Sequence, residues 1–215
     1  MRSFKIFAAA TILLSCMTAK AQELVIRIDD MGALHSVNTA SIDTYQNGIA
    51  KSVEVLAVGS WFPEAVKMLK ENPGLDVGIH LAITSEWENV KWRPLTQCPS
   101  LVDENGFFYP MMGPNPAYPG QSVMENMANF DIEEIEKEFR AQIELALKNI
   151  PQITHISGHM FSTGFSPEVV AVVQKLSDEY NLPSIDRAES FEQYGFTYAG
   201  YDGPKATLEE KVESF

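Results

Sequence analysis

Carboxylate and imidazole side chains occur near the ends of three apolar segments of the sequence. The segment VIRIDDMG (25–32) ends in two neighbouring aspartates, GIHLAIT (78–84) carries one histidine, and ITHISGHMF (153–161) carries two. One carboxylate and two imidazoles form a three-ligand site for a divalent ion, with positions left open for water and substrate. A second carboxylate beside the ion could accept a proton from that water. The candidate residues are Asp29, Asp30, His80, His155 and His159.

Each of these patterns has a more common explanation when it is taken alone. An Asp-Asp pair usually marks a solvated strand end or a helix cap, and a single histidine in an apolar strand is usually a core residue. Two histidines four residues apart bind metal only in a minority of cases. Here, however, all candidates lie near the carboxyl ends of predicted strands, where sites in α/β folds assemble. Because neighbours in a plain strand point to opposite faces, joint action of both aspartates requires a turn or bulge that begins at Asp29.

The segments that carry these residues alternate with helical patterns. Strands are predicted at 24–28, 52–58, 76–83, 153–157 and 184–187, and helices at 36–46, from 63 to the ENPG break at 71–74, at 131–149 and at 166–180. Such alternation indicates right-handed crossovers and a mostly parallel sheet. A closed eight-unit barrel needs roughly 250 residues. We therefore predict an α/β fold that is an irregular, incomplete (β/α) barrel. The segment TLEEKVESF resembles a helix that stops in mid-pattern, so we expect the chain to be truncated at Phe215.

The strand at 76–83 shows how such a barrel would separate its two faces. Val77, Ile79 and Leu81 share one parity, and Gly78 and His80 share the other. The apolar side is expected to pack against surrounding helices. The small, polar side suits the inside of a barrel mouth that holds a site.

A segment with little regular pattern, 84–130, separates this strand from the helix at 131–149. It is rich in proline and aromatic residues. Structureless insertions of this length are usually functional lids or binding loops. Because flat aromatic faces stack on sugar rings, Trp87 and Trp92 are candidate substrate-binding residues. The alternative is that these rings pack the segment onto the barrel as a small core of its own.

The N-terminus resembles a secretory signal. Arg2 and Lys5 precede an apolar run that is too short for a stable membrane anchor, and small residues around Lys20 suit cleavage before Gln22. We expect a signal peptide at 1–21, one domain at 22–215, no transmembrane segment, and export to the periplasm or the exterior. A lipoprotein anchored through Cys16 of LLSC is the less favoured alternative.

Composition narrows the range of partners. The formal net charge is −13, and removal of 1–21 would make it about −16. Such a chain is a poor partner for nucleic acid phosphates or anionic lipid. Cys98 would be the only remaining cysteine, so no internal disulfide is expected. A neutral or cationic substrate fits the charge, and an oligomer is compatible with it.

At these residues the sequence resembles the YdjC-like carbohydrate deacetylase family, which includes chitooligosaccharide deacetylases. The segments IRIDDMG, NGIAKSVEVLAVG, PGLDVGIHLAIT and ITHISGH occur in the order of that family and close to its spacing. The resemblance implies an irregular (β/α) barrel that removes N-acetyl groups from sugars with a divalent metal. It implies Asp29 as catalytic base and Asp30, His80 and His159 as metal ligands.

Two departures from the family pattern accompany the resemblance. Ser157 stands where the family often has Asp, and Met160, Phe161 and Thr163 replace a histidine-rich tail. A further family histidine lies in a late HPG-like segment that this chain does not reach. The polar surroundings of the metal are therefore expected to be thinner than usual.

The mechanism that these expectations favour is hydrolysis of a linear amide of an N-acetylated sugar or oligosaccharide. Zinc or magnesium would bind and activate water, and Asp29 would take its proton. His155 is the candidate general acid for the departing amine. Arg187 would orient Asp29 or bind substrate, unless it forms only a surface salt bridge. Two alternatives stay open: a secreted glycan-binding protein without turnover, and a non-haem iron enzyme that uses the same ligand set.

Overall fold

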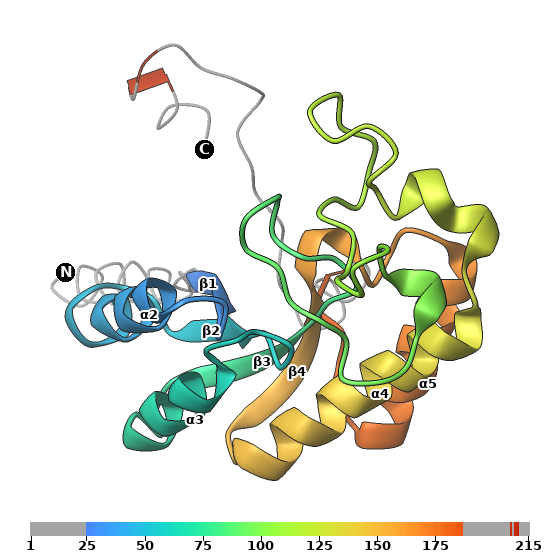
Figure 1. Cartoon of the computed structure of the whole chain (residues 1–215). Helices are drawn as coiled ribbons and strands as arrows, with labels where there is room; N and C mark the ends of the chain where they lie inside the picture. The colour runs from blue at the N-terminus through green and yellow to red at the C-terminus, as the bar shows by residue number, and fades with distance from the viewer. Residues whose placement is uncertain (1–24, 187–206, 208, 211–215) are drawn as a thin grey trace, which may run out of the picture.

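The computed structural model describes residues 25–186, 207, 209 and 210, and these form a parallel sheet flanked by helices (Figure 1). The strands are β1 (Arg27–Met31), β2 (Ser52–Val55), β3 (Asp76–Leu81) and β4 (Ile153–Gly158). The helices are α2 (His35–Asn47), α3 (Phe62–Glu71), α4 (Ile132–Asn149) and α5 (Pro167–Tyr180), with short 3-10 turns η1 (Pro99–Leu101), η2 (Met124–Asn129) and η3 (His159–Phe161).

The sheet has the strand order of a (β/α) barrel. Its order is β1-β2-β3-β4, and all three pairings are parallel. In Figure 1, α2 and α3 lie beside β1 and β2, while α4 and α5 lie beside β3 and β4. The described strands form an open arc rather than a closed cylinder, so the prediction of an incomplete parallel α/β barrel is confirmed.

The two faces of the sheet differ as the sequence predicts. Val77, Ile79 and Leu81 of β3 are buried in the apolar cores that the strands form with the helices. On the other face, Glu54 of β2 pairs in register with Gly78, and Gly78 pairs with His155 of β4. The inner face is therefore lined by polar groups that are also buried from solvent.

Local sequence signals determine where the two long helices near the site begin. The side chain of Asp131 caps α4 by accepting a hydrogen bond from the backbone N–H of Glu133. Ser166 caps α5 in the same way, and Pro167 occupies its first turn, where the missing N–H costs nothing. The helices predicted at 131–149 and at 166–180 thus begin at these two capping residues.

The segment at 84–130 is packed rather than loose. Trp92, Cys98, Leu101 and Phe108 are buried in the larger of the two cores, whereas Trp87 is about half exposed, at 49%. Trp92 and Phe108 therefore pack the segment onto the barrel, as the alternative proposed, but they join its larger core and do not form a small core of their own. Cys98 is a buried free thiol, and burial, with Glu138 nearby, raises its pKa to about 12.

Element boundaries differ from the predicted ones at every strand except the one at 153–157, which is longer by one residue. β2 ends at Val55 and not at 58, and β3 ends at Leu81 and not at 83. β1 begins at Arg27 and runs through both aspartates, whereas the prediction ended it at Ile28. The strand predicted at 184–187 is reduced to a bridge between Ser184 and Ile156. Within the described residues, no helix has the length and apolar character needed to cross a bilayer. The signal peptide, Cys16, Arg187 and most of the predicted final helix lie outside the described residues.

Candidate metal centre

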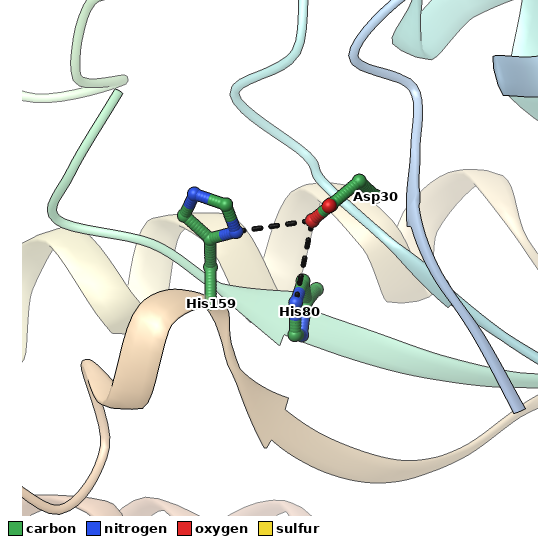
Figure 2. A group of neighbouring side chains, drawn as sticks. All are labelled: Asp30, His80 and His159. Atoms are coloured by element: carbon green, nitrogen blue, oxygen red, sulfur yellow. Dashed lines mark hydrogen bonds and ion pairs between the residues drawn. The ribbon is translucent and has the colours of Figure 1, made fainter. Parts of the chain in front are cut away.

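Three of the predicted residues meet at the carboxyl end of the sheet. Asp30 comes from β1, His80 from β3, and His159 directly follows β4. The Asp30 Oδ1 atom lies 3.0 Å from His159 Nδ1 and 3.4 Å from His80 Nε2 (Figure 2). Each residue offers a ligand atom, and these atoms all lie within 4.8 Å of one another.

A β-bulge brings Asp30 into this position. Ile28 pairs with Val53 and Met31 with Val55, so β1 has one extra residue relative to β2. Asp30 itself has a φ of 70°, in the left-handed region that non-glycine residues rarely adopt. Strained backbone of this kind concentrates at functional sites. The bulge that the sequence argument requires at Asp29 is therefore present.

His80 is almost fully buried and presents one ring nitrogen to Asp30. Its Nδ1 atom lies 2.8 Å from the hydroxyl oxygen of Ser157. Burial and the neighbouring His159 lower the pKa of His80 to about 3, so the ring is neutral at ordinary pH. A neutral imidazole is the form that binds metal.

The pKa of His159 is raised, whereas that of His80 is lowered. Burial lowers the pKa of His159, but the hydrogen bond to Asp30 and the Glu86 carboxylate outweigh it and raise the pKa to about 9. For Asp30, burial acts to raise the pKa, yet the hydrogen bond and charge of His159 bring it below its usual value. His159 Nε2 is buried without an aligned hydrogen bond, although Glu86 Oε2 lies 3.2 Å away.

The three residues fit a divalent ion. They supply one carboxylate and two imidazoles, the donor set of an open site. His80 Nδ1 already has a protein partner, so its Nε2 lone pair is the one available at the centre. His159 Nε2, which has no aligned hydrogen bond, is a further buried nitrogen that an ion or substrate could bind.

Asp29 lies beside this group and is held by an arginine. Arg27 Nε is 2.8 Å from Asp29 Oδ1, and Arg27 Nη2 is 3.1 Å from Oδ2, which makes a two-point ion pair. The Asp29 side chain remains 42% exposed. Asp29 is thus oriented but accessible, as a base that receives a proton from water must be. Arg27 therefore orients Asp29, and the role predicted for Arg187 lies outside the described residues.

His155 lies deeper, between two protein partners. Its Nε2 is 2.7 Å from Glu54 Oε1, and its Nδ1 is 2.7 Å from Thr154 Oγ1. Burial lowers the pKa of His155, but the hydrogen bond and charge of Glu54 more than offset this, so the pKa lies above its usual value. Both ring nitrogens are therefore engaged within the sheet interior, and the assignment of His155 as general acid stays a prediction.

The two candidate tryptophans differ in position. Trp92 is only 3% exposed, donates its indole N–H to Thr84 O at 2.9 Å, and lies edge-on to His159 with ring centroids 5.7 Å apart. It packs under the site and offers no face to a sugar. Trp87 is exposed and has a φ of 62°. A substrate platform therefore stays a prediction for Trp87 alone.

Sequence reasoning missed three charged residues around the centre: Arg27, Glu54 and Glu86. Glu54 carried a usable signal, because a lone carboxylate in the middle of an apolar, central strand must have a buried partner. Glu86 lies in a polar stretch, and Arg27 alternates with apolar residues as in a half-exposed strand, so neither carried such a signal.

Comparison with known proteins shows which family the chain matches. The family described as YdjC-like protein matches residues 23–209. The chain belongs to this family. Carbohydrate deacetylase 1 of Listeria innocua is 32% identical over 174 residues, which cover 80% of this chain and 64% of that protein. The carbohydrate deacetylase of Geobacillus stearothermophilus is 32% identical over 159 residues, covering 74% of this chain and 57% of the relative.

This YdjC-like chain spans about three-fifths of the length of those curated relatives. A crystal structure from Enterococcus faecalis V583, of a protein proposed to cleave cellobiose phosphate, matches with a TM-score of 0.66 at 24% identity. The match covers 86% of this chain and 70% of that one. At this identity the likeness supports the fold.

Proposed function

We propose that this protein is a metal-dependent hydrolase that removes N-acetyl groups from amino sugars or oligosaccharides. The observation that carries the proposal is the meeting of Asp30, His80 and His159 at one end of the sheet. It is supported by relatives named carbohydrate deacetylases.

Asp30, His80 and His159 would hold the divalent ion, zinc or magnesium. When bound, such an ion supplies a Lewis acid for the acetamide carbonyl and lowers the pKa of water. The neutral ring of His80 and the carboxylate of Asp30 are already in the protonation states that a ligand needs. His159 would have to release a proton first.

Asp29 is the proposed base. Its carboxylate is exposed enough to meet water, and the two-point contact with Arg27 fixes its direction. A base must lie within hydrogen-bond reach of the proton that it removes. Asp29 and Asp30 share the β1 bulge, which supports a role for Asp29 beside the residues that would hold the ion.

The proton for the departing amine is proposed to come from His155. Its raised pKa, caused by the hydrogen bond and charge of Glu54, favours the protonated ring that a general acid needs. Delivery would require the His155 Nε2–H to leave Glu54, with which it is paired at 2.7 Å.

Substrate would be bound beside the centre, with Trp87 as the proposed sugar-stacking residue because its ring is exposed. Glycan binding without turnover is the second candidate, favoured by the same exposed ring. The acidic chain does not repel the cationic amine product. Export through residues 1–21 also belongs to this proposal, and sequencing the N-terminus of the mature protein tests it.

Acetate release from N-acetylated oligosaccharides, with and without a chelator, tests the proposal. We expect release that stops on chelation and returns with added metal. Asp29→Asn should retain metal yet lose turnover, whereas Asp43→Asn, which changes an exposed aspartate on α2, should remain active. Sugar binding without acetate release would support the glycan-binding alternative, and full turnover in Asp29→Asn would remove the base assignment.

A further inference from the structure

Glu54 is a fully buried carboxylate in the centre of β2, and the proposed reaction assigns it no role. It accepts a hydrogen bond from the Ser157 hydroxyl and another from His155 Nε2. Arg27 Nε lies farther away, at 3.9 Å. A buried charge is costly unless it is paired and hydrogen-bonded. These partners supply that compensation, and one of them leads to the metal centre.

Ser157 connects Glu54 to a proposed metal ligand. Because the Ser157 hydroxyl donates its proton to Glu54, its oxygen is left to accept a hydrogen bond. The His80 Nδ1 atom, 2.8 Å away, must then carry the proton and donate it to Ser157. The lone pair of His80 is thereby assigned to Nε2, the atom 3.4 Å from Asp30 Oδ1.

The sheet register keeps this chain of hydrogen bonds together. His80 of β3 pairs directly with Ser157 of β4, and Gly78 lies between Glu54 and His155 in the row behind. A Cβ atom at position 78 would overlap both the Glu54 carboxylate and the His155 ring. The missing side chain at Gly78 is what lets Glu54 reach β4. Ser157 is itself fully buried, so its hydroxyl direction is set by these partners.

We propose that Glu54, acting through Ser157, is a positioning residue that holds His80 in the Nδ1–H tautomer and so increases the affinity of the centre for a divalent ion. The inference rests on the metal site of the proposed function and adds to it a carboxylate that touches no ligand atom directly. Partners of ligating histidines that act in this way contribute 10- to 100-fold to metal affinity.

A purely structural role for Glu54 makes different predictions. If Glu54 served only to neutralise His155 and Arg27, Glu54→Gln would alter stability but leave the tautomer of His80 and the metal affinity unchanged. The His80 tautomer and the metal affinity therefore distinguish the two roles, whereas a measurement of stability does not.

The experiment compares four variants by Zn²⁺ affinity and by the tautomer of His80. Zn²⁺ is titrated into chelator-stripped protein in competition with a chromophoric chelator. The tautomer is read from long-range ¹H–¹⁵N spectra of the metal-free protein, assigned with His80→Gln. Ser157→Ala removes the acceptor, Glu54→Gln removes the charge, and Ser157→Thr retains the hydroxyl. Glu138→Gln is the matched control, since Glu138 is an equally buried glutamate hydrogen-bonded elsewhere.

We expect Ser157→Ala to shift His80 toward the Nε2–H tautomer and to weaken Zn²⁺ binding about 10- to 100-fold. Glu54→Gln should show a smaller loss, and both Ser157→Thr and Glu138→Gln should bind like wild type. The double variant Glu54→Gln/Ser157→Asp places the carboxylate directly against His80 Nδ1 and should recover most of the affinity. If Ser157→Ala fails to fold, the Zn²⁺ affinity of this double variant tests the proposal instead.

Two results would overturn the inference. One is wild-type Zn²⁺ affinity and tautomer in Glu54→Gln, whatever Ser157→Ala shows, and the other is no recovery of affinity in the folded double variant. These results are distinct from failure of the proposed function. A wild-type protein that binds Zn²⁺ but releases no acetate would refute deacetylation and leave the variant comparison intact. A wild-type protein that binds no Zn²⁺ would refute both.

Discussion

Glu54 and Glu138 are both fully buried glutamates, yet they lie in regions with different partners. Glu138 on α4 accepts hydrogen bonds from the backbone N–H groups of Leu95 and Thr96, from the Thr96 hydroxyl and from the Gln142 amide. All of these donors are neutral. Glu54 instead contacts a histidine, an arginine and a serine that leads to the metal centre.

The difference shows what to look for in a buried carboxylate. Neutral donors that belong to a loop indicate that the carboxylate holds that loop, and Glu138 thereby fixes part of the 84–130 segment on α4. Titratable partners that lead to a cluster of ligand atoms indicate a role in the site. The comparison can be tested by changing each region and measuring metal affinity and stability separately.

The largest effect is expected from Asp30→Asn. This change removes the only carboxylate among the three proposed ligands, so Zn²⁺ affinity should fall by more than the 10- to 100-fold that loss of an outer partner costs. Acetate release should fall to background. Titration of Zn²⁺ into chelator-stripped protein checks the prediction, with Asp43→Asn as the exposed control. Affinity within threefold of wild type would show that Asp30 is not a ligand.

Glu138→Ala should have its main effect on stability. Four donors would lose their acceptor, and buried groups left unpaired cost about 1–3 kcal/mol each, partly relieved by water, so we expect a loss of roughly 3 kcal/mol. Urea unfolding measures this loss. Zn²⁺ affinity of the folded variant should stay unchanged, and a large fall in affinity would erase the distinction between the two glutamates.

Gly78→Ala, which adds one methyl group, should lower both the stability and the Zn²⁺ affinity. The new Cβ overlaps Glu54 and His155, and overpacking of a core costs about 1–3 kcal/mol. We expect lower stability in urea together with weaker Zn²⁺ binding, because Glu54 must move away from β4. Gly113→Ala is the matched control, since its Cβ would meet only the Met124 sulfur at 3.9 Å. Equal behaviour of the two variants would contradict the packing argument.

The sequence predicts the fold and the meeting of Asp30, His80 and His159 because both depend on local patterns. Strand and helix periods repeat along the chain, and Asp30, His80 and His159 each stand at a predicted strand end. The extra residue in β1 also follows from the demand that both aspartates act together. These features require only the rule that parallel strands end at one edge.

The sequence does not predict what depends on register between distant strands. Glu54 and Ser157 are 103 positions apart, and their contact requires β2, β3 and β4 to align with Gly78 between them. A shift of one residue in the β2–β3 or the β3–β4 pairing would put Glu54 and Ser157 on opposite faces. The same reason explains Trp92, whose burial depends on how the 84–130 segment folds back and not on its own neighbours.

The smallest expected effect is a pH dependence of stability that arises from His155. Its pKa is raised in the folded protein, against an unfolded value of about 6.5. The stabilising contribution is therefore complete below about pH 6.5 and is lost as the pH rises through the folded pKa. Urea unfolding of chelator-treated protein between pH 6 and 8 should show stability falling with pH. His159, whose pKa is raised to about 9, adds a slope of the same sign from about pH 6.5 upward, so the contribution of His155 is read from the difference between wild type and variant. His155→Gln, which can still donate to Glu54, should reduce the slope, whereas Glu138→Gln should preserve it. An unchanged slope in His155→Gln would show that the Glu54–His155 pair does not titrate with folding.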